Sequence, residues 1–224
     1  MRNSTSRSLY QYWNEVRGSR IAPRRFEIEP SRISGLLPET FILEAVSDNV
    51  LRYRLAGTRL SSQFGRDFRG ANFLDQWTVR ERSVVMNKVE ALITSGCPAV
   101  IISEASSVGG RKAVFEIVLL PLVHTQGRID RILGAASCVS PPGWLGEDAL
   151  VWQRLIDARL VVPEPEPEVE PASAHEVRSN PISMARGLEP SPFLAHVRNA
   201  RIVRQDCRLF RVYDGGLLTR ETEN

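Results

Sequence analysis

The chain of 224 residues carries 29 Lys and Arg, 26 Asp and Glu and a formal net charge of +3. Neither sign of charge predominates strongly enough to indicate what the protein binds. No apolar run approaches the roughly 20 residues that a membrane-spanning helix needs, and no apolar run that could act as a secretory signal precedes Glu15. Three widely spaced cysteines without a CxxC pair argue against a disulfide framework and a zinc site. We therefore expect a cytoplasmic protein.

All but two of the basic residues are Arg, the exceptions being Lys88 and Lys112. Guanidinium groups pair with phosphate, so this excess could indicate nucleic-acid binding. Acidic residues are interspersed nearly everywhere, however, and Arg replaces Lys throughout the chain rather than in one block. We favour a compositional bias over a nucleic-acid interface.

The N-terminal residues predict a helix that begins with a capping box of Ser8 and Gln11 and stops at Gly18. Its apolar side chains recur at helical spacing and form one stripe: Leu9, Tyr12, Trp13 and Val16. A helix of about three turns is marginal alone. It would pack either on the following domain as a cap or on a second copy as a homodimer contact, and the sequence does not separate these uses.

The middle of the chain predicts five strands, at residues 41–46, 51–56, 99–105, 113–120 and 129–139. Short helices are expected at 30–38 and from Thr58. A longer helix is expected between the capping box of Thr78 and Glu81 and the stop signal Gly96. This order predicts an α+β fold, in which a five-stranded antiparallel sheet carries short helices on one face and the N-terminal helix as a cap.

Three segments in this region resemble a bacterial single-domain PAS family that is found mainly in alphaproteobacteria. They are YWNEVRGSRIAPRR, EPSRISGLLPETFILEA and RYRLAGTRLSSQFGRDFRGANFLDQW. The resemblance covers roughly residues 9–146, and its most specific part is 54–66. It implies a PAS fold and a regulatory or signalling role, with a small molecule bound inside the domain or a protein partner on the sheet face.

In such a fold the pocket lies between the sheet and the short helices. The resemblance therefore makes four bulky apolar residues candidates for its wall: Phe64, Phe73, Trp77 and Met86. Aromatic residues and Met are also default core residues. We favour the interpretation that these four fill the core, and the ligand, if there is one, stays unidentified.

No cofactor or metal is predicted. Haem needs an axial ligand, and His124, the one His in the predicted domain, falls in a turn between strands. A light-sensing flavin domain would need a reactive Cys in an Asn-Cys-Arg-Phe-Leu-Gln setting, whereas Cys97 follows a helix and Cys138 lies in a strand. Neither haem nor covalent flavin chemistry is expected.

The sequence also lacks the motifs of an enzyme. It has no P-loop, GxSxG or HExxH motif, and its three scattered His offer little for general acid–base chemistry. We expect a non-enzymatic sensory or regulatory protein whose signal leaves through contacts with a signalling protein. The alternative is a nucleic-acid-associated regulator that uses the Arg-rich ends of the chain.

The predicted organisation has five parts. They are an N-terminal helix and cap (1–35), the PAS-like domain (36–146), a segment that packs on it (147–162), a disordered Pro/Glu-rich linker (163–192) and an Arg-rich C-terminal segment (193–224). The last segment holds His196, Arg198, Arg201, Arg204, Arg208 and Arg211. It could add as a strand to a sheet edge, contact RNA or DNA, or be a weakly ordered terminus.

Overall fold

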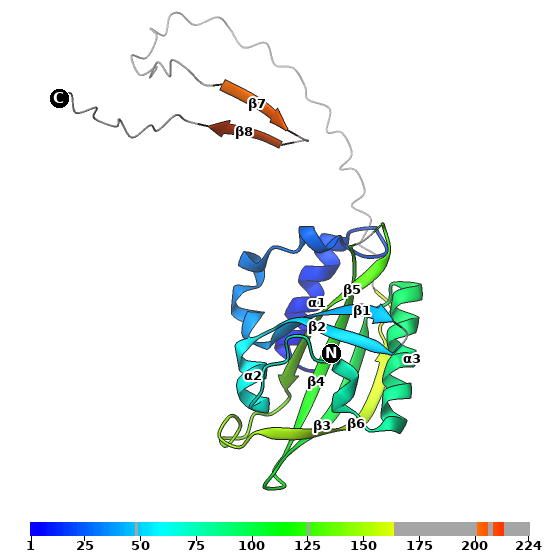
Figure 1. The fold of residues 1–224 in the computed structure, drawn as a ribbon, viewed down its shortest axis with the longest axis vertical. Helices are drawn as coiled ribbons and strands as arrows, with labels where there is room; N and C mark the ends of the chain where they lie inside the picture. The colour runs from blue at the N-terminus through cyan, green and yellow to red at the C-terminus, as the bar shows by residue number, and fades with distance from the viewer. Residues whose placement is uncertain (48, 125, 164–200, 206–207, 213–224) are drawn as a thin grey trace, which may run out of the picture. The chain divides into compact units, whose positions relative to one another are not determined.

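The computed structural model describes residues 1–47, 49–124, 126–163, 201–205 and 208–212, and the chain divides into two compact units, Met1–Val169 and Glu170–Asn224. The first unit holds a six-stranded antiparallel sheet in the order β2-β1-β5-β4-β3-β6 (Figure 1). Its strands are β1 (Thr40–Ser47), β2 (Val50–Ala56), β3 (Ala99–Ser107), β4 (Lys112–Val123), β5 (Ile129–Cys138) and β6 (Leu150–Leu160). The α+β fold and the five predicted strands are confirmed.

The sheet has one strand more than predicted. The segment treated as packing against the domain contains β6, which pairs antiparallel with β3 from Ala99↔Leu160 to Ser107↔Leu150. Without β6, the backbone groups of β3 would form an open sheet edge. Register shifts leave Val151 and Ile156 without a partner on β3. These two bulges interrupt the alternation of inward and outward side chains from which a strand is predicted.

One face of the sheet, the inner face, is covered by α2 (Thr58–Phe64), η3 (Phe73–Gln76) and α3 (Val79–Ser95). The predicted capping box of Thr78 and Glu81 opens α3, and Gly96 ends it in the left-handed conformation at φ 72°. The cap of α2 is Gly57 rather than Thr58. The backbone of Gly57 lies so close to the carbonyl groups of Leu37 and Pro38 that a Cβ on Gly57 would overlap them.

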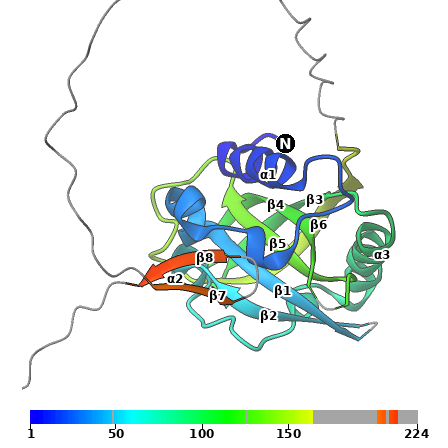
Figure 2. The same ribbon diagram turned by 90° about the horizontal axis from the view of Figure 1, so that it is seen from above.

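The opposite, outer face lies under α1 (Ser4–Arg17) and η2 (Pro30–Glu39), while η1 (Arg25–Glu27) lies in the connection between them. Figure 2 shows α1 along the side of the sheet that faces away from α2 and α3. Helices therefore cover both faces, where the sequence predicted short helices on one. The N-terminal helix acts as a cap on this domain.

The cap of α1 is Asn3 and not the predicted Ser8. The Asn3 side chain accepts from Thr5 N at 2.8 Å. The backbone N–H groups of Arg2 and Asn3 donate to Oε2 and Oε1 of the buried Glu116, at 2.7 and 3.0 Å. The helix begins one turn earlier than predicted because Asn3 caps it, and Glu116 on β4 holds the backbone that leads into this cap.

The second unit holds two strands, β7 (Arg201–Gln205) and β8 (Arg208–Val212), which pair antiparallel. Both strands lie within the predicted Arg-rich C-terminal segment, residues 193–224. The predicted linker lies outside the described residues from 164 onward.

Candidate functional site

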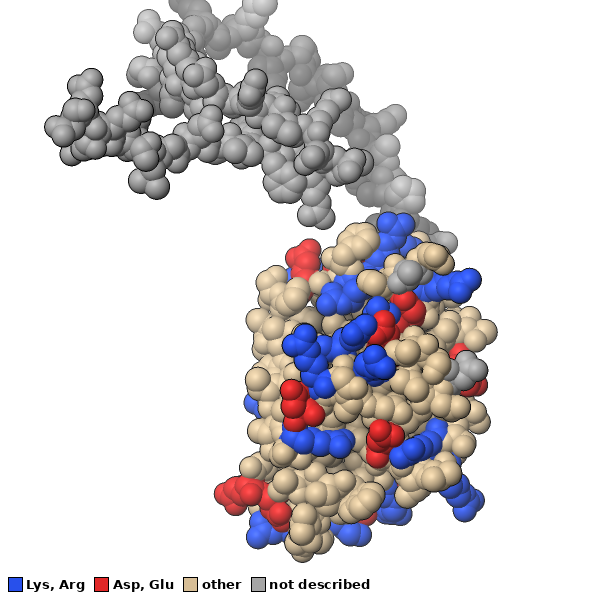
Figure 3. All heavy atoms as spheres, in the orientation of Figure 1, with Lys and Arg blue, Asp and Glu red and all other residues tan. Residues whose placement is uncertain are grey.

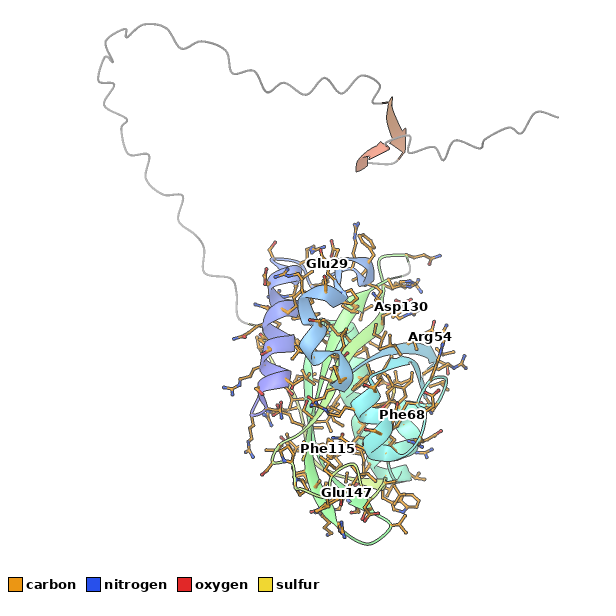
Figure 4. All side chains as sticks on the ribbon, turned by 90° about the vertical axis from the view of Figure 1, so that its left-hand side faces the viewer. Glu29, Arg54, Phe68, Phe115, Asp130 and Glu147 are labelled. Carbon is orange, nitrogen blue, oxygen red and sulfur yellow. The ribbon has the colours of Figure 1, made fainter. Side chains whose placement is uncertain are left out.

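The four residues predicted for a pocket wall all lie in the inner core, each less than a tenth exposed. Phe73 and Trp77 are neighbours, with ring centroids 6.2 Å apart. Phe64 lies beside Phe68 and Phe115 instead, at 5.5 and 6.0 Å. Figure 4 shows Phe68 and Phe115 inside the unit, so aromatic rings occupy much of the space between sheet and helices.

Met86 lies in the inner core but also borders a surface groove of about 330 Å³ between α3 and the ends of β1 and β5. The groove has an apolar floor that includes Ala45 and Ile129, and charged residues such as Glu90 and Arg128 also line it. Of the four predicted residues, only Met86 borders this groove, whose volume is at the lower end for small-molecule sites.

A chain of buried polar side chains crosses the inner core, and the sequence analysis did not identify it. Gln76 Nε2 donates to Tyr53 Oη at 2.8 Å, and Gln153 Nε2 donates to Gln76 Oε1 at 2.6 Å. Ser103 Oγ in turn donates to Gln153 Oε1 at 2.9 Å. The chain joins β2, η3, β6 and β3. Its sequence signal is weak, because Gln153 belongs to the strand that the pattern missed.

Trp77 supplies a further polar group to this core. Its indole Nε1 is buried and has no hydrogen-bond partner within the described part of the chain. Nearby, burial raises the pKa of Tyr53 well above its ordinary value, although the hydrogen bond from Gln76 opposes this, so the phenol stays protonated. The inner core therefore has a donor that an acceptor atom of a small molecule or water could satisfy.

The outer face of the sheet is covered only in part. Helix α1 begins over Glu116, and beyond that point the sheet lacks a covering helix in the described residues. The side chains there form what we call the bare sheet patch: Glu104, Ser106, Lys112, Val114, Val139, Trp152 and Arg154. Trp152 is 70% exposed, and Val114 and Val139 are each 38% exposed.

Three charges of this patch form a cluster. Glu104 Oε1 lies 3.0 Å from Lys112 Nζ and 3.3 Å from Arg154 Nη2. The ammonium of Lys112 is the main reason that the pKa of Glu104 is lowered, and Arg154 adds to the effect. The patch thus combines an exposed indole and two valines with charges that are held in place, a mixture typical of protein interfaces.

A second charged network lies on the other edge of the sheet. Glu44 pairs with both Arg54 and Arg131, and Arg131 also pairs with Asp130. Figure 4 places Arg54 and Asp130 on the side of the unit away from α1. On the face in Figure 3, basic side chains gather over the upper half with carboxylates between them, so the surface there is mixed rather than uniformly basic.

The remaining candidate groups are dispersed. His124 lies in the β4–β5 turn as predicted, with Nδ1 3.7 Å from Asp130 Oδ2. Cys97 follows α3, and Cys138 ends β5. Within the described residues no group of three His, Cys, Asp or Glu could hold a metal ion.

The strand order, the helices on the inner face and the cap on the outer face agree with a match to the family model of the PAS domain, which covers residues 1–137. The chain belongs to the PAS domain family. No curated protein matches the sequence. PAS domains are typically sensory modules, which is the broad role that this membership supports.

The solved structures that match this chain have low sequence identity to it. The light state of the blue-light photoreceptor Aureochrome1 LOV is 20% identical, over 46% of this chain and 83% of that one, with a TM-score of 0.37. A Rhodobacter sphaeroides LOV protein is 12% identical, over 47% and 61%, with a TM-score of 0.38. A Vibrio cholera VqmA–ligand–DNA complex is 15% identical, over 50% and 51%, with a TM-score of 0.39.

In the described part of this PAS protein, none of the helices has the length and apolar character required to cross a membrane.

Proposed function

We propose that this PAS protein is a non-enzymatic, cytoplasmic regulator that acts through protein contacts at the bare sheet patch. The observation that carries the proposal is Trp152, which stands 70% exposed on a sheet face that α1 leaves open. Trp is enriched among the residues that dominate binding energy at protein interfaces.

The surroundings of Trp152 support this role. Val114 and Val139 extend the apolar surface across β4 and β5, and the Lys112–Glu104–Arg154 cluster supplies oriented charges beside it. The partner is a signalling protein or a second copy of the chain. A small molecule in the inner core, accepting a hydrogen bond from Trp77 Nε1, would supply the sensory input.

Replacing Trp152 tests the proposal. The full tagged chain is used to capture partners from extract after cross-linking, and its mass in solution is measured across a concentration series. We expect Trp152→Ser to lose at least tenfold of the bound partner or to dissociate the homodimer. Phe26→Ser is the matched control, because Phe26 is equally exposed at 70% and lies in η1, near the far end of β4.

The patch has no such role if Trp152→Ser captures the same proteins and shows the same mass as the unaltered chain. Equal losses in Trp152→Ser and Phe26→Ser would also count against it, because they would indicate a general surface effect.

A nucleic-acid-associated role is the second candidate. It is favoured by β7 and β8, which form a two-stranded antiparallel ribbon with two Arg in each strand. Such ribbons can enter a nucleic-acid groove. Binding of the full chain to labelled duplex and single-stranded RNA and DNA should then weaken steeply as salt rises. Affinity that does not depend on salt would rule this role out.

A further inference from the structure

The amide and hydroxyl side chains of the buried polar chain lie inside a largely apolar core. Gln76, Gln153 and Ser103 are each less than a tenth exposed, in a core that is otherwise aromatic and aliphatic. A buried amide is tolerated when its hydrogen bonds are made and is costly when one is lost. Gln76 Oε1 accepts its hydrogen bond from Gln153, so this contact makes the position of β6 matter to the core.

The same strand has a second tie to the inner face. Leu155 N donates to Glu81 Oε1 at 2.8 Å, while Glu81 also caps α3 through Thr78. Both ties therefore come from one short stretch, residues 76–81, which ends η3 and opens α3. Both reach β6, the outermost strand on its side of the sheet.

Strand β6 is suited to local movement. It lies beyond the part of the chain that the family model covers, and it has one neighbouring strand, β3. Its two bulges, at Val151 and Ile156, interrupt the ladder on either side of Gln153. Edge strands with interrupted ladders open at lower free energy than central strands.

Strand β6 carries a residue of the polar chain on one face and a residue of the bare sheet patch on the other. Successive residues of a strand point to opposite faces. Gln153 points inward to Gln76, and its neighbour Trp152 lies in the bare sheet patch on the outer face. On the inner side, Gln76 directly precedes Trp77, whose indole has the unsatisfied donor.

We propose that residues 76–81 form a latch on β6. Gln76 and Glu81 hold the strand closed, and a rearrangement of the core at Gln76 and Trp77 releases it, which changes how Trp152 is presented on the outer face. The consequence for a partner rests on the proposed function of the bare sheet patch. The latch itself is a property of the domain alone.

Hydrogen exchange of the full chain, measured by mass spectrometry without any partner, tests the latch. Gln76→Leu removes the acceptor of Gln153 and leaves a buried amide unpaired. We expect the amides of β6 to exchange about tenfold faster, with those of β4 and β5 changed less than about twofold. Thr40→Val is the matched control, because it deletes the hydrogen bond from the buried Thr40 to Leu37 O, on a strand that is not a neighbour of β6 in the sheet.

The combined variant Tyr53→Phe/Gln76→Leu/Ser103→Ala/Gln153→Leu separates the lost hydrogen bonds from lost packing. Replacing all four members of the polar chain with apolar side chains leaves none of its groups unpaired, so exchange in β6 should return to within about threefold of the unaltered chain. Unchanged exchange in β6, uniform acceleration through β4, β5 and β6, or a combined variant as fast as Gln76→Leu would each overturn the latch.

This experiment is independent of the partner surface. If Trp152→Ser leaves capture intact while Gln76→Leu opens β6, the proposed function fails and the latch stands. If exchange is uniform while Trp152→Ser abolishes capture, the latch fails and the surface stands.

Discussion

The two faces of the central sheet are covered in different ways. The inner face packs against α2, η3 and α3, which follow one another along the chain and contribute a dense aromatic cluster. The outer face is mostly aliphatic and lies under α1 and η2. Helix α1 precedes every strand, and polar contacts fix its position: Glu116 holds its start, 114 residues away from Arg2, and Pro121 O accepts from Trp13 Nε1.

This difference indicates which parts of the domain can unfold separately. We expect the inner face to unfold as one cooperative core, since Phe41, Tyr53 and Phe73 contact one another and Trp77 contacts Phe73. The outer cover is one helix and η2, packed on the sheet through apolar side chains such as Leu9 and Trp13 and held by polar contacts to Glu116 and Pro121, so we expect it to loosen separately from the inner face. The open end of that face is where the partner surface lies, and β6 links it to the inner core.

The largest effect is expected from the inner face. Phe73→Ala removes a ring that contacts Phe41, Tyr53 and Trp77 and should lower the free energy of unfolding by about 3–5 kcal/mol. Urea denaturation followed by Trp fluorescence measures this loss. Phe26→Ala, at an exposed ring, should stay within about 0.5 kcal/mol. A loss below about 1.5 kcal/mol for Phe73→Ala would mean that the inner core is not the cooperative one.

A smaller and more local effect is expected at the outer cover. Glu116→Ala leaves the backbone N–H groups of Arg2 and Asn3 without their acceptor, at a cost of about 1–3 kcal/mol. Hydrogen exchange should quicken in α1 more than in α3. Glu116→Gln keeps one carbonyl acceptor in the same place and should lose less. Equal acceleration in α1 and α3 would show that the two covers are not separable.

The smallest effect concerns the response of the outer cover to pH. Burial works against ionisation of Glu39, but hydrogen bonds from Ser137, Thr5 and Arg59 outweigh it and lower the pKa of Glu39 below its ordinary value of 4.5. Since the folded pKa is the lower one, this contribution to stability is present above pH 4.5 and is lost as pH falls through the folded pKa.

Unfolding by urea at a series of pH values between about 7 and 3 measures the effect. The free energy of unfolding should fall on acidification below about pH 5, and Glu39→Gln should flatten part of that decline. A Glu39→Gln variant with an unaltered pH profile would show that these bonds do not favour the ionised form.

Most of the fold could be predicted because its signals are local. The alternation of Leu51 and Tyr53 with Arg gave β2, and the Thr78–Glu81 box with Gly96 gave both ends of α3. The start of α1 was placed at Ser8 instead of Asn3, because both residues are suitable caps by type and only the structure shows that Glu116, on a distant strand, holds the backbone at Asn3. Strand β6 was not predicted, because its bulges interrupt the alternation of side chains that indicates a strand.

For the candidate site too, residue types could be predicted from the sequence but spatial neighbours could not. The bulky residues of the inner face were identified by residue type, and the structure places Phe73 beside Trp77 but Phe64 in a different part of the aromatic cluster. No pattern in the sequence indicated that Gln76 and Gln153, 77 residues apart, share a buried hydrogen bond. Local pattern cannot pair two isolated amides across that distance.

Sequence alone determined the α+β class, the PAS resemblance and the inner helices, because periodicity, capping and turn residues act over a few neighbouring positions. Tertiary structure alone decided that a sixth strand closes the β3 edge, that α1 is pinned by Glu116, and that Trp152 and Gln153 face opposite sides of one strand. Those outcomes depend on backbone and side-chain groups that meet only after the chain has folded, where burial makes each unpaired polar group costly.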